Sequence, residues 1–252
     1  MAKSSTSRKR GKADEVEEDA PERRRFRPIR WLFRWFFRLL FGAIAVVLLA
    51  VIAVAVLNPP MTPYMFQERQ RLGSVTQTWV ALDEISPHMA RAAVAAEDAN
   101  FCEHWGLDLD AIRQAMLEGG TRGASTISQQ VVKNVYLWHG RSYTRKALEA
   151  LMTPVVEAVW SKRRILEVYL NVAEFDEGVF GVEAAARHYY GVSAADLSAV
   201  QAGRRAAILP DPKGRSASNP SDFVIRRART IMDGAATIRA DGRAACFGGD
   251  ED

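Results

Sequence analysis

The longest apolar stretch of the chain runs from Leu39 to Leu57, 19 residues without a charged side chain. Its length is close to the roughly 20 apolar residues that a helix needs to cross the hydrocarbon core of a bilayer. Arginines and aromatic rings crowd the segment just before it, at Arg30, Trp31, Arg34, Phe37 and Arg38. Because basic residues stay on the cytoplasmic side and aromatic rings settle at the interface, we expect a membrane anchor over residues 31–58.

This anchor predicts a single-pass protein of the cytoplasmic (inner) membrane, with everything after Asn58 outside the cytoplasm. A cleaved signal peptide is the alternative interpretation. Signal peptides usually have a shorter apolar stretch, followed by a small-x-small cleavage site. Asn58-Pro59-Pro60 fits such a site poorly, so a retained anchor is favoured.

Beyond the anchor, apolar residues recur at helical spacing and no strand-like alternation is sustained, so we predict an all-α fold. Cap residues place the starts of helices at Ser86, Thr126, Ser142, Ser193 and Ser221, with a kink at Pro154 and a helix end at Gly191. Residues 174–181 are expected to form a glycine-punctuated loop. The predicted organisation is a disordered tail over 1–30, the anchor, a connector over 59–74, one helical domain over 75–240 and a C-terminal tail over 241–252.

The net charge of +4 is unevenly distributed. Residues 1–38 hold 12 Lys and Arg against 6 Asp and Glu, a net of +6, which leaves 22 against 24, a net of −2, for the remainder. The basicity therefore belongs to the N-terminal tail, and charge gives no reason to expect a nucleic-acid partner. Two cysteines, Cys102 and Cys246, could pair outside the cytoplasm or stay as separate thiols, and the sequence leaves both open.

Candidate chemistry begins at Glu97 and Asp98, which the helix starting at Ser86 delivers near its C-terminal end. The negative pole of the helix dipole disfavours ionised carboxylates there. A glutamate with a raised pKa is what a general base near neutral pH needs. A solvated acidic pair or a simple helix cap is the alternative for these two residues.

A second candidate lies thirty residues further on. Thr126 and Gln129 form a capping box after Ser125, and the helix that follows presents Gln130, Lys133 and Asn134 beside its apolar stripe. Free backbone amides, hydroxyls and an ammonium suit a diphosphate. The spacing is not that of a nucleotide P-loop. A capped surface helix with a solvated lysine is the alternative.

The residues from 97 read E-D-x-x-F-x-x-H-x-G-x-D, and those from 123 read G-A-S-T-x-S-Q-Q-x-x-K-N. Arg145-Lys146-x-x-Glu149 and a stretch from Asn171 to Tyr190 follow in order. This ordered set closely resembles the motifs of the family 51 glycosyltransferases, which polymerise peptidoglycan strands from lipid II. The resemblance covers roughly residues 75–240. Without it, Arg145 and Glu149 would read as an exposed ion pair four residues apart.

The resemblance implies a lysozyme-like fold and an inverting hexosyl transfer, with Glu97 and Glu149 as the catalytic carboxylates. It implies substrate-binding roles for Asp98, Phe101, His104, Gly123, Ser125, Thr126, Gln129, Gln130, Lys133, Asn134, Arg145, Lys146 and Asn171. No cofactor is required, although a divalent cation such as Mg²⁺ could sit at the diphosphate. The implied partners are lipid II, the growing glycan strand, membrane lipid and other wall-synthesis or division proteins.

Two other functions compete with this one: a lytic transglycosylase of the same fold, which would not need a diphosphate cradle, and a non-catalytic membrane scaffold. No Ser-x-x-Lys occurs in the chain, so we expect no penicillin-binding activity and a monofunctional enzyme. The sequence departs from the family pattern at Asn100, where many relatives carry a basic residue. It departs again at Gln201, Arg204 and Arg205, where two arginines fall on an expected buried face and would need to snorkel or pair.

Overall fold

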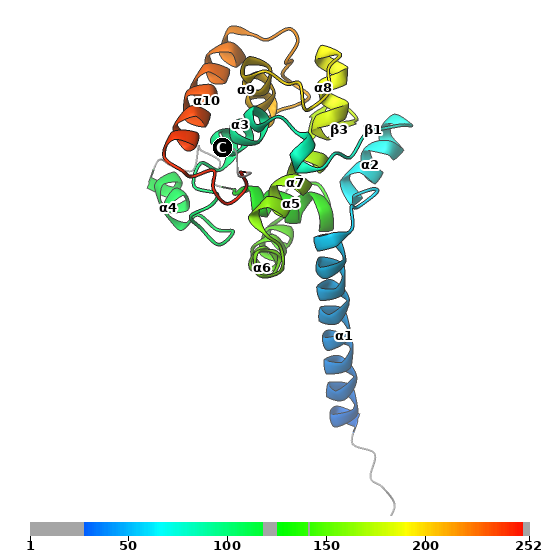
Figure 1. The fold of residues 1–252 in the computed structure, drawn as a ribbon. Coiled ribbons are helices and arrows are strands. Elements are labelled where there is room, and N and C mark those ends of the chain that lie inside the picture. The colour runs from blue at the N-terminus through cyan, green and yellow to red at the C-terminus, as the bar shows by residue number, and fades with distance from the viewer. Residues whose placement is uncertain (1–27, 118–124, 141, 249–252) are drawn as a thin grey trace, which may run out of the picture. The chain divides into compact units, whose positions relative to one another are not determined.

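The computed structural model describes residues 28–117, 125–140 and 142–248. Helices dominate these ranges, which confirms the predicted all-α class, and one small sheet accompanies them (Figure 1). The chain divides into two units, residues 1–44 and 45–252. Most of the predicted N-terminal tail and the last four residues lie outside the described ranges, and the predicted domain limits stay predictions.

Helix α1 spans Pro28–Val56. Its residues from Ile29 to Val56 form a helix that is long and apolar enough to cross a membrane. The end of α1 that belongs to the second unit is held by Trp160, which caps the end of α6 (Tyr143–Val159), and by Arg164 of α7 (Lys162–Val172). The Trp160 indole donates a 2.8 Å hydrogen bond to the Val51 carbonyl, and Arg164 donates a 2.9 Å bond to the Val54 carbonyl.

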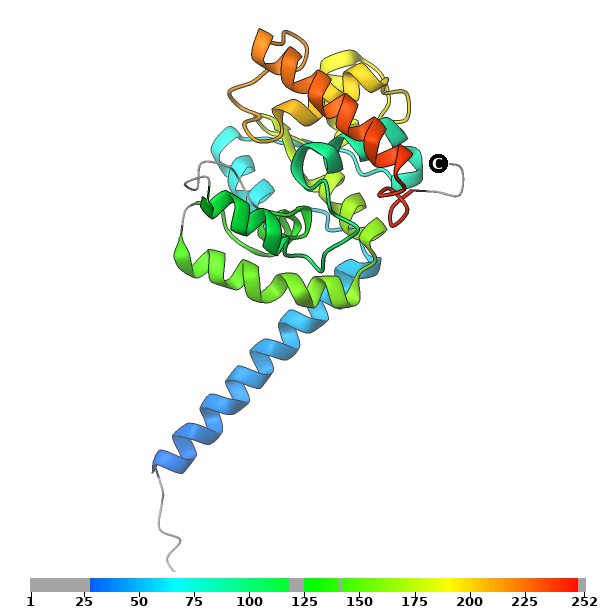
Figure 2. The same ribbon diagram turned by 90° about the vertical axis from the view of Figure 1, so that its left-hand side faces the viewer.

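The remaining helices form two packed groups. α3, α9 and α10 lie against one another, and α5 lies against α6 and α7 (Figures 1 and 2). The bounds are α2 Pro63–Leu72, a 3₁₀ turn Leu82–Glu84, α3 Pro87–Glu97, α4 Leu109–Leu117, α5 Ile127–Tyr136, α6 Tyr143–Val159, α7 Lys162–Val172, α8 Val182–Tyr190, α9 Ala199–Ile208 and α10 Asp222–Ala240. The core is fullest around α7, whose residues Ile165, Leu166, Val168, Leu170 and Val172 are all buried.

Local capping chemistry explains where these helices begin and end. Thr126 and Gln129 form the predicted capping box at α5, and Ser221 caps α10 through the Val224 amide. Gly191 ends α8 at φ +68°, in the left-handed region that glycine adopts without strain. The prediction for α9 was wrong. Its cap is Ser198, which pairs with Gln201 in a capping box, whereas Ser193 stabilises a turn by bonding to Asp196.

The predicted loop at 174–181 was also wrong, because it folds as a hairpin. Strands β2 Glu174–Asp176 and β3 Val179–Phe180 pair antiparallel, and β1 Thr76–Gln77 adds to β3 in parallel, giving the order β1-β3-β2. The turn is made by Gly178 at φ +73°. The hairpin anchors Glu174 beside α2.

Arg205 on α9 occupies the predicted buried face and is 0% exposed. It neither snorkels nor pairs. Among the described residues its three guanidinium nitrogens have no hydrogen-bond partner. The rings of Phe175, Tyr189 and Tyr190 surround it at 5.1, 5.1 and 5.7 Å from the guanidinium carbon. Burial lowers the pKa of Arg205 to about 10.

The predicted C-terminal tail is ordered as far as residue 248. A series of turns follows α10, and the sulfur of Cys246 forms a disulfide with Cys102, 144 residues earlier. The sequence had left this pairing open. Ala244 and Phe247 are buried, so the segment is part of the domain core.

Candidate active site

Glu97 is the last residue of α3, and its carboxylate is buried between α3 and α5. Gln130 on α5 donates a 2.8 Å hydrogen bond from Nε2 to Glu97 Oε2. The other oxygen, Oε1, is buried and has no hydrogen-bond partner in the part of the chain that the structure describes. Burial raises the pKa of Glu97, and Gln130, Arg227 and Lys133 partly offset that effect. A carboxylate in this state can accept a proton near neutral pH.

Asp98 joins the end of α3 to the start of α5. Its Oδ1 lies 2.7 Å from His104 Nε2, and its Oδ2 accepts a 3.0 Å hydrogen bond from the Ile127 amide. The Thr126 hydroxyl donates a 2.6 Å bond to the Gly106 carbonyl, closing the same junction. Through these bonds, Asp98 and His104 help to hold the end of α3, and with it Glu97, in position.

Gly106 explains the glycine in the first motif. Its φ is +79°, and a Cβ there would come within 2.5 Å of Thr153 Cγ2 on α6. Any larger residue would therefore push the loop away from α6. The turn needs glycine for both reasons.

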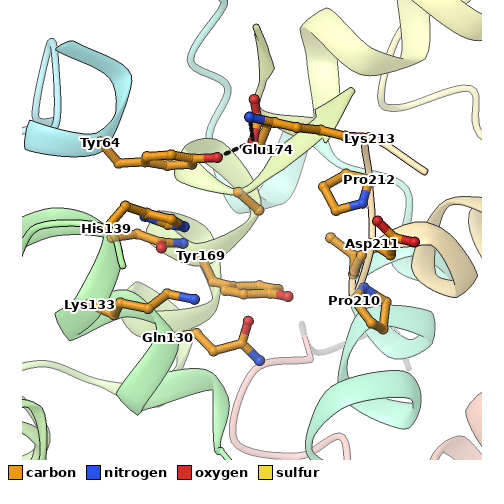
Figure 3. A pocket seen from close by; sticks show the side chains of 13 residues that line it. Tyr64, Gln130, Lys133, His139, Tyr169, Glu174, Pro210, Asp211, Pro212 and Lys213 are labelled. Atoms are coloured by element: carbon orange, nitrogen blue, oxygen red, sulfur yellow. Dashed lines mark hydrogen bonds and ion pairs between the residues drawn. The ribbon is translucent and has the colours of Figure 1, made fainter. Parts of the chain in front are cut away.

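The polar face of α5 opens into a cavity of about 290 Å³. Figure 3 shows Lys133 pointing into it, with Gln130 and Tyr169 on the same side and the loop of Pro210, Asp211 and Pro212 opposite. Asn134, another member of the predicted set, also lines this space.

Lys133 is not the exposed lysine that the sequence suggested. It is largely buried, and burial lowers the pKa of its ammonium. No hydrogen bond or ion pair joins the Lys133 ammonium to another described residue, although the carboxylates of Glu149 and Glu97 act on it electrostatically. A buried cation without a paired carboxylate that faces a cavity is suited to an anionic ligand.

Glu149 on α6 is 2% exposed, which excludes the exposed ion pair considered from the sequence. Arg145 Nη1 donates a 2.8 Å hydrogen bond to Glu149 Oε2, and Lys146 forms an ion pair with Oε1. Lys146 also donates a 3.2 Å bond to the Ser125 hydroxyl. Glu149 thus holds two cations at the start of α6, next to the start of α5.

A second cavity, of about 240 Å³, lies on the other side of the Glu97–Gln130 hydrogen bond. Its lining includes Glu97, Asp98, Ser125 and Thr126, together with Asn100 and Asp108. Asn100 Nδ2 donates a 3.1 Å hydrogen bond to Asp108 Oδ2, so this uncharged side chain helps to hold the lining of the second cavity. Glu97 lines the second cavity while Gln130 lines the first, so the two cavities adjoin at the candidate base.

Other predicted site residues lie elsewhere. Phe101 is a fully buried residue of the loop that follows Glu97, and Asn171 is fully buried beside β1. The amide of Asn171 bonds to the Val80 backbone at 2.8 and 3.0 Å, so its side chain is committed to the fold. Gln129 is buried in the capping box. Gly123 lies outside the described residues.

Several residues at the site were missed from the sequence. Arg227 on α10 acts electrostatically on Glu97, and its Nε has no hydrogen-bond partner among the described residues. His139 lines the first cavity, stacks on Tyr64 at 3.5 Å between ring centroids, and has a pKa lowered to about 4 by burial. Lys213 reaches the same cavity and pairs with Glu68 at 3.0 Å. No motif spacing marks these residues, because they come from elements far apart in the chain.

One group of side chains in the described ranges could hold a metal ion. Ligand atoms of Asp98, His104 and Asp108 lie within 4.8 Å of one another. The Asp98–His104 hydrogen bond and the Asn100–Asp108 hydrogen bond already account for this cluster. It gives no independent sign of a cation.

The model of the family described as transglycosylase matches residues 66–236. The chain is 63% identical over 218 residues to the biosynthetic peptidoglycan transglycosylase of Jannaschia sp. (strain CCS1), covering 86% of this chain and 90% of that protein. It is 48% identical to the protein of the same name from a Pseudomonas fluorescens strain, covering 79% and 88%. For the Caulobacter vibrioides protein of that name the identity is 44%, covering 86% and 97%.

Proposed function

We propose that this chain, which belongs to the transglycosylase family, is a peptidoglycan glycosyltransferase that polymerises lipid II into linear glycan strands. The observation that carries the proposal is the position of Glu97. Glu97 lines one cavity and is hydrogen-bonded to Gln130, which lines the other together with the Lys133 cation, and Glu97 Oε1 is buried without a hydrogen-bond partner among the described residues. A base between an acceptor and a donor, beside a cation for the leaving group, is the arrangement that this reaction needs.

In the proposed reaction, Glu97 Oε1 takes the proton from the 4-hydroxyl of the GlcNAc of lipid II. The 4-oxygen of that GlcNAc then forms a bond to C1 of the growing strand, on the face opposite the diphosphate. The bond from C1 to the diphosphate oxygen breaks, and undecaprenyl diphosphate leaves with the bonding electrons. The configuration at C1 is inverted. The unpaired Oε1 supports this role, because a partnered oxygen would be a weaker proton acceptor.

The negative charge that develops on the diphosphate is met by the cations around α5 and α6. Lys133 is free of a carboxylate partner within the described part of the chain, so its charge is available to a phosphate. Arg145 and Lys146 lie at the start of α6, and Glu149 fixes both. Glu149 therefore acts by orienting these two cations. A divalent cation stays a prediction that a titration with Mg²⁺ and EDTA checks, and none of these steps requires one.

We propose that α1 anchors the enzyme in the cytoplasmic membrane with its N-terminus in the cytoplasm. The basic residues before the apolar stretch support this orientation. It would place the site on the side where wall precursors are polymerised, within reach of a lipid-linked substrate. Because the proposed enzyme builds cell wall at this membrane, wall-synthesis and division proteins are proposed as its partners.

The decisive experiment incubates the purified full-length protein in detergent with lipid II and separates the products by size. We expect glycan strands many disaccharides long, together with undecaprenyl diphosphate. A second incubation, with preformed strands, tests for a lytic enzyme, which would shorten them. Strand cleavage without synthesis would establish the lytic reaction, and no change in either substrate would leave the scaffold interpretation. Either result would overturn the proposal.

A further inference from the structure

The last described segment, residues 241–248, folds back onto the loop that follows Glu97. We call this segment the C-terminal clasp. It lies beyond residues 66–236, the part matched by the family model. The Cys102–Cys246 disulfide ties it covalently to the loop, five residues after Glu97. The clasp is therefore tied to the loop that follows the candidate base in the chain.

Two further contacts join the clasp to the same loop. Arg243 Nη1 donates a 3.1 Å hydrogen bond to the Ala99 carbonyl. The buried Phe247 ring packs on Phe101, with 6.3 Å between ring centroids. The clasp is in turn fixed to α7, because Arg163 donates a 3.1 Å bond to the Phe247 carbonyl. It thus bridges a packed helix and the loop.

The loop that the clasp holds carries the geometry of the base. It has no helix or strand of its own between Asp98 and His104, so few backbone bonds define it. The Phe101 amide donates a 3.0 Å bond to the Asp98 carbonyl, and Asp98 bonds to His104. Lys162 Nζ lies 4.5 Å from the Phe101 ring centroid and donates a 2.8 Å bond to the His104 carbonyl. Movement of Phe101 would therefore disturb the residue next to Glu97.

We propose that the C-terminal clasp is a positioning element of the Glu97 base, with Phe247 and Cys246 as its main contacts. These residues touch no substrate and act through the 98–104 loop. The proposal rests on the proposed glycosyltransferase function. With the clasp released, we expect the loop to loosen next to Glu97 and water to gain access to its buried carboxylate.

Water at Glu97 has a defined consequence. Its pKa is raised chiefly by burial, so hydration lowers that pKa and makes Glu97 a weaker base. The charged and titratable groups that face Glu97 are Asp98, Lys133 on α5, Tyr169 on α7 and Arg227 on α10. None of these belongs to the clasp, so they remain when it is removed. Asp98 also raises the pKa of Glu97, so hydration and any withdrawal of Asp98 with the loosened loop would both shift that pKa downward.

The test compares full-length enzyme with a truncation after Ala240 and with Phe247→Ala, measuring kcat and KM for lipid II across pH. A truncation after Gly248 is the matched control, since it removes four residues and keeps the clasp. We expect the two clasp variants to lose about 10- to 100-fold in kcat, because small misplacements of a catalytic group cost that much. KM should change little, and the acid limb of the pH profile should move to lower pH. Phe247→Leu, which keeps apolar packing, should retain most of the rate.

Reduction provides an arm that needs no truncation. Dithiothreitol should lower kcat of the full-length enzyme and leave a Cys102→Ser, Cys246→Ser double variant unchanged. If the truncated protein fails to fold by circular dichroism, this arm and Phe247→Ala decide the question, with Phe247→Leu as the packing control. Unchanged kcat and an unchanged acid limb on reduction and in Phe247→Ala would overturn the proposal.

Failure of the proposed function would be recognised separately, by full-length enzyme that makes no strands from lipid II. Hydrogen exchange then tests the clasp alone. Faster exchange of the 98–104 amides after truncation would support it, and unchanged exchange would refute it.

Discussion

The Gln130 amide and the Glu97 carboxylate form a 2.8 Å hydrogen bond that leaves Glu97 Oε1 buried and unpartnered among the described residues. The bond fixes the direction in which the free oxygen points. It also limits the cost of burying the carboxylate, since a hydrogen bond to the charged form lowers its pKa. One neutral partner thus keeps Glu97 basic and still ionisable.

Glu97→Gln should lower polymerisation by about two orders of magnitude or more, because it removes the proton acceptor and keeps the shape. The same variant should melt at a higher temperature than wild type near pH 7. The folded-state pKa of Glu97 is raised, so its carboxyl favours folding below the unfolded pKa and loses that contribution as pH rises through the folded pKa. Strand assays and melting curves at pH 4 and pH 7 check both effects. Near-normal polymerisation by this variant would contradict the assignment of the base.

Gln130→Leu tests the hydrogen bond itself. Its loss should raise the pKa of Glu97 further, because Gln130 is the largest influence that lowers it. A base must be deprotonated to act, so the acid limb of the rate profile should move to higher pH while the rate at alkaline pH recovers. Val132→Leu on the same helix, buried away from the cavity, is a packing control that should leave the limb in place. An unmoved limb in Gln130→Leu would mean that another group controls the profile.

Lys133→Ala should reduce turnover strongly and leave the melting temperature unchanged or higher. Lys133 carries a buried charge without a paired carboxylate in the described ranges, so its removal breaks no ion pair. Lys162→Ala is the contrasting variant. It removes the 2.9 Å partner of the buried Glu157, so it should lower the melting temperature. If Lys133→Ala kept full activity and melted earlier, the residue would be structural.

Features that depend on local chemistry were predictable from the sequence. The Thr126–Gln129 capping box and the glycine end of α8 need only their own neighbours, and both were confirmed. The same kind of signal was available for α9, because Ser198 and Gln201 have the spacing of a capping box. The prediction of Ser193 as the start of this helix overlooked that spacing.

Burial could not be predicted in the same way, because it depends on which face of a helix meets another element. Glu149 and Lys133 looked exposed on their own helices, and both are covered once α5 packs on α6. Strands of two or three residues are too short to give an alternating pattern, so the β2–β3 hairpin passed for a loop. Electrostatic interactions between residues 130 positions apart, such as that of Arg227 with Glu97, cannot be recognised from motif spacing.

Arg205 supplies the last prediction, because it is a buried cation that nothing in the described structure neutralises. Three aromatic faces attract it, each worth about 0.5–2 kcal/mol, whereas the desolvation of an unpaired ion costs several kcal/mol. Arg205→Met keeps a long unbranched side chain and removes the charge, so it should raise the free energy of unfolding by about 1–4 kcal/mol. Arg205→Lys keeps a charge and loses planar stacking, so it should not stabilise the fold. Urea unfolding of both variants measures the difference, and strand synthesis should stay near the wild-type rate because Arg205 lines neither cavity. A less stable Met variant would mean that the aromatic cage outweighs the desolvation of the cation.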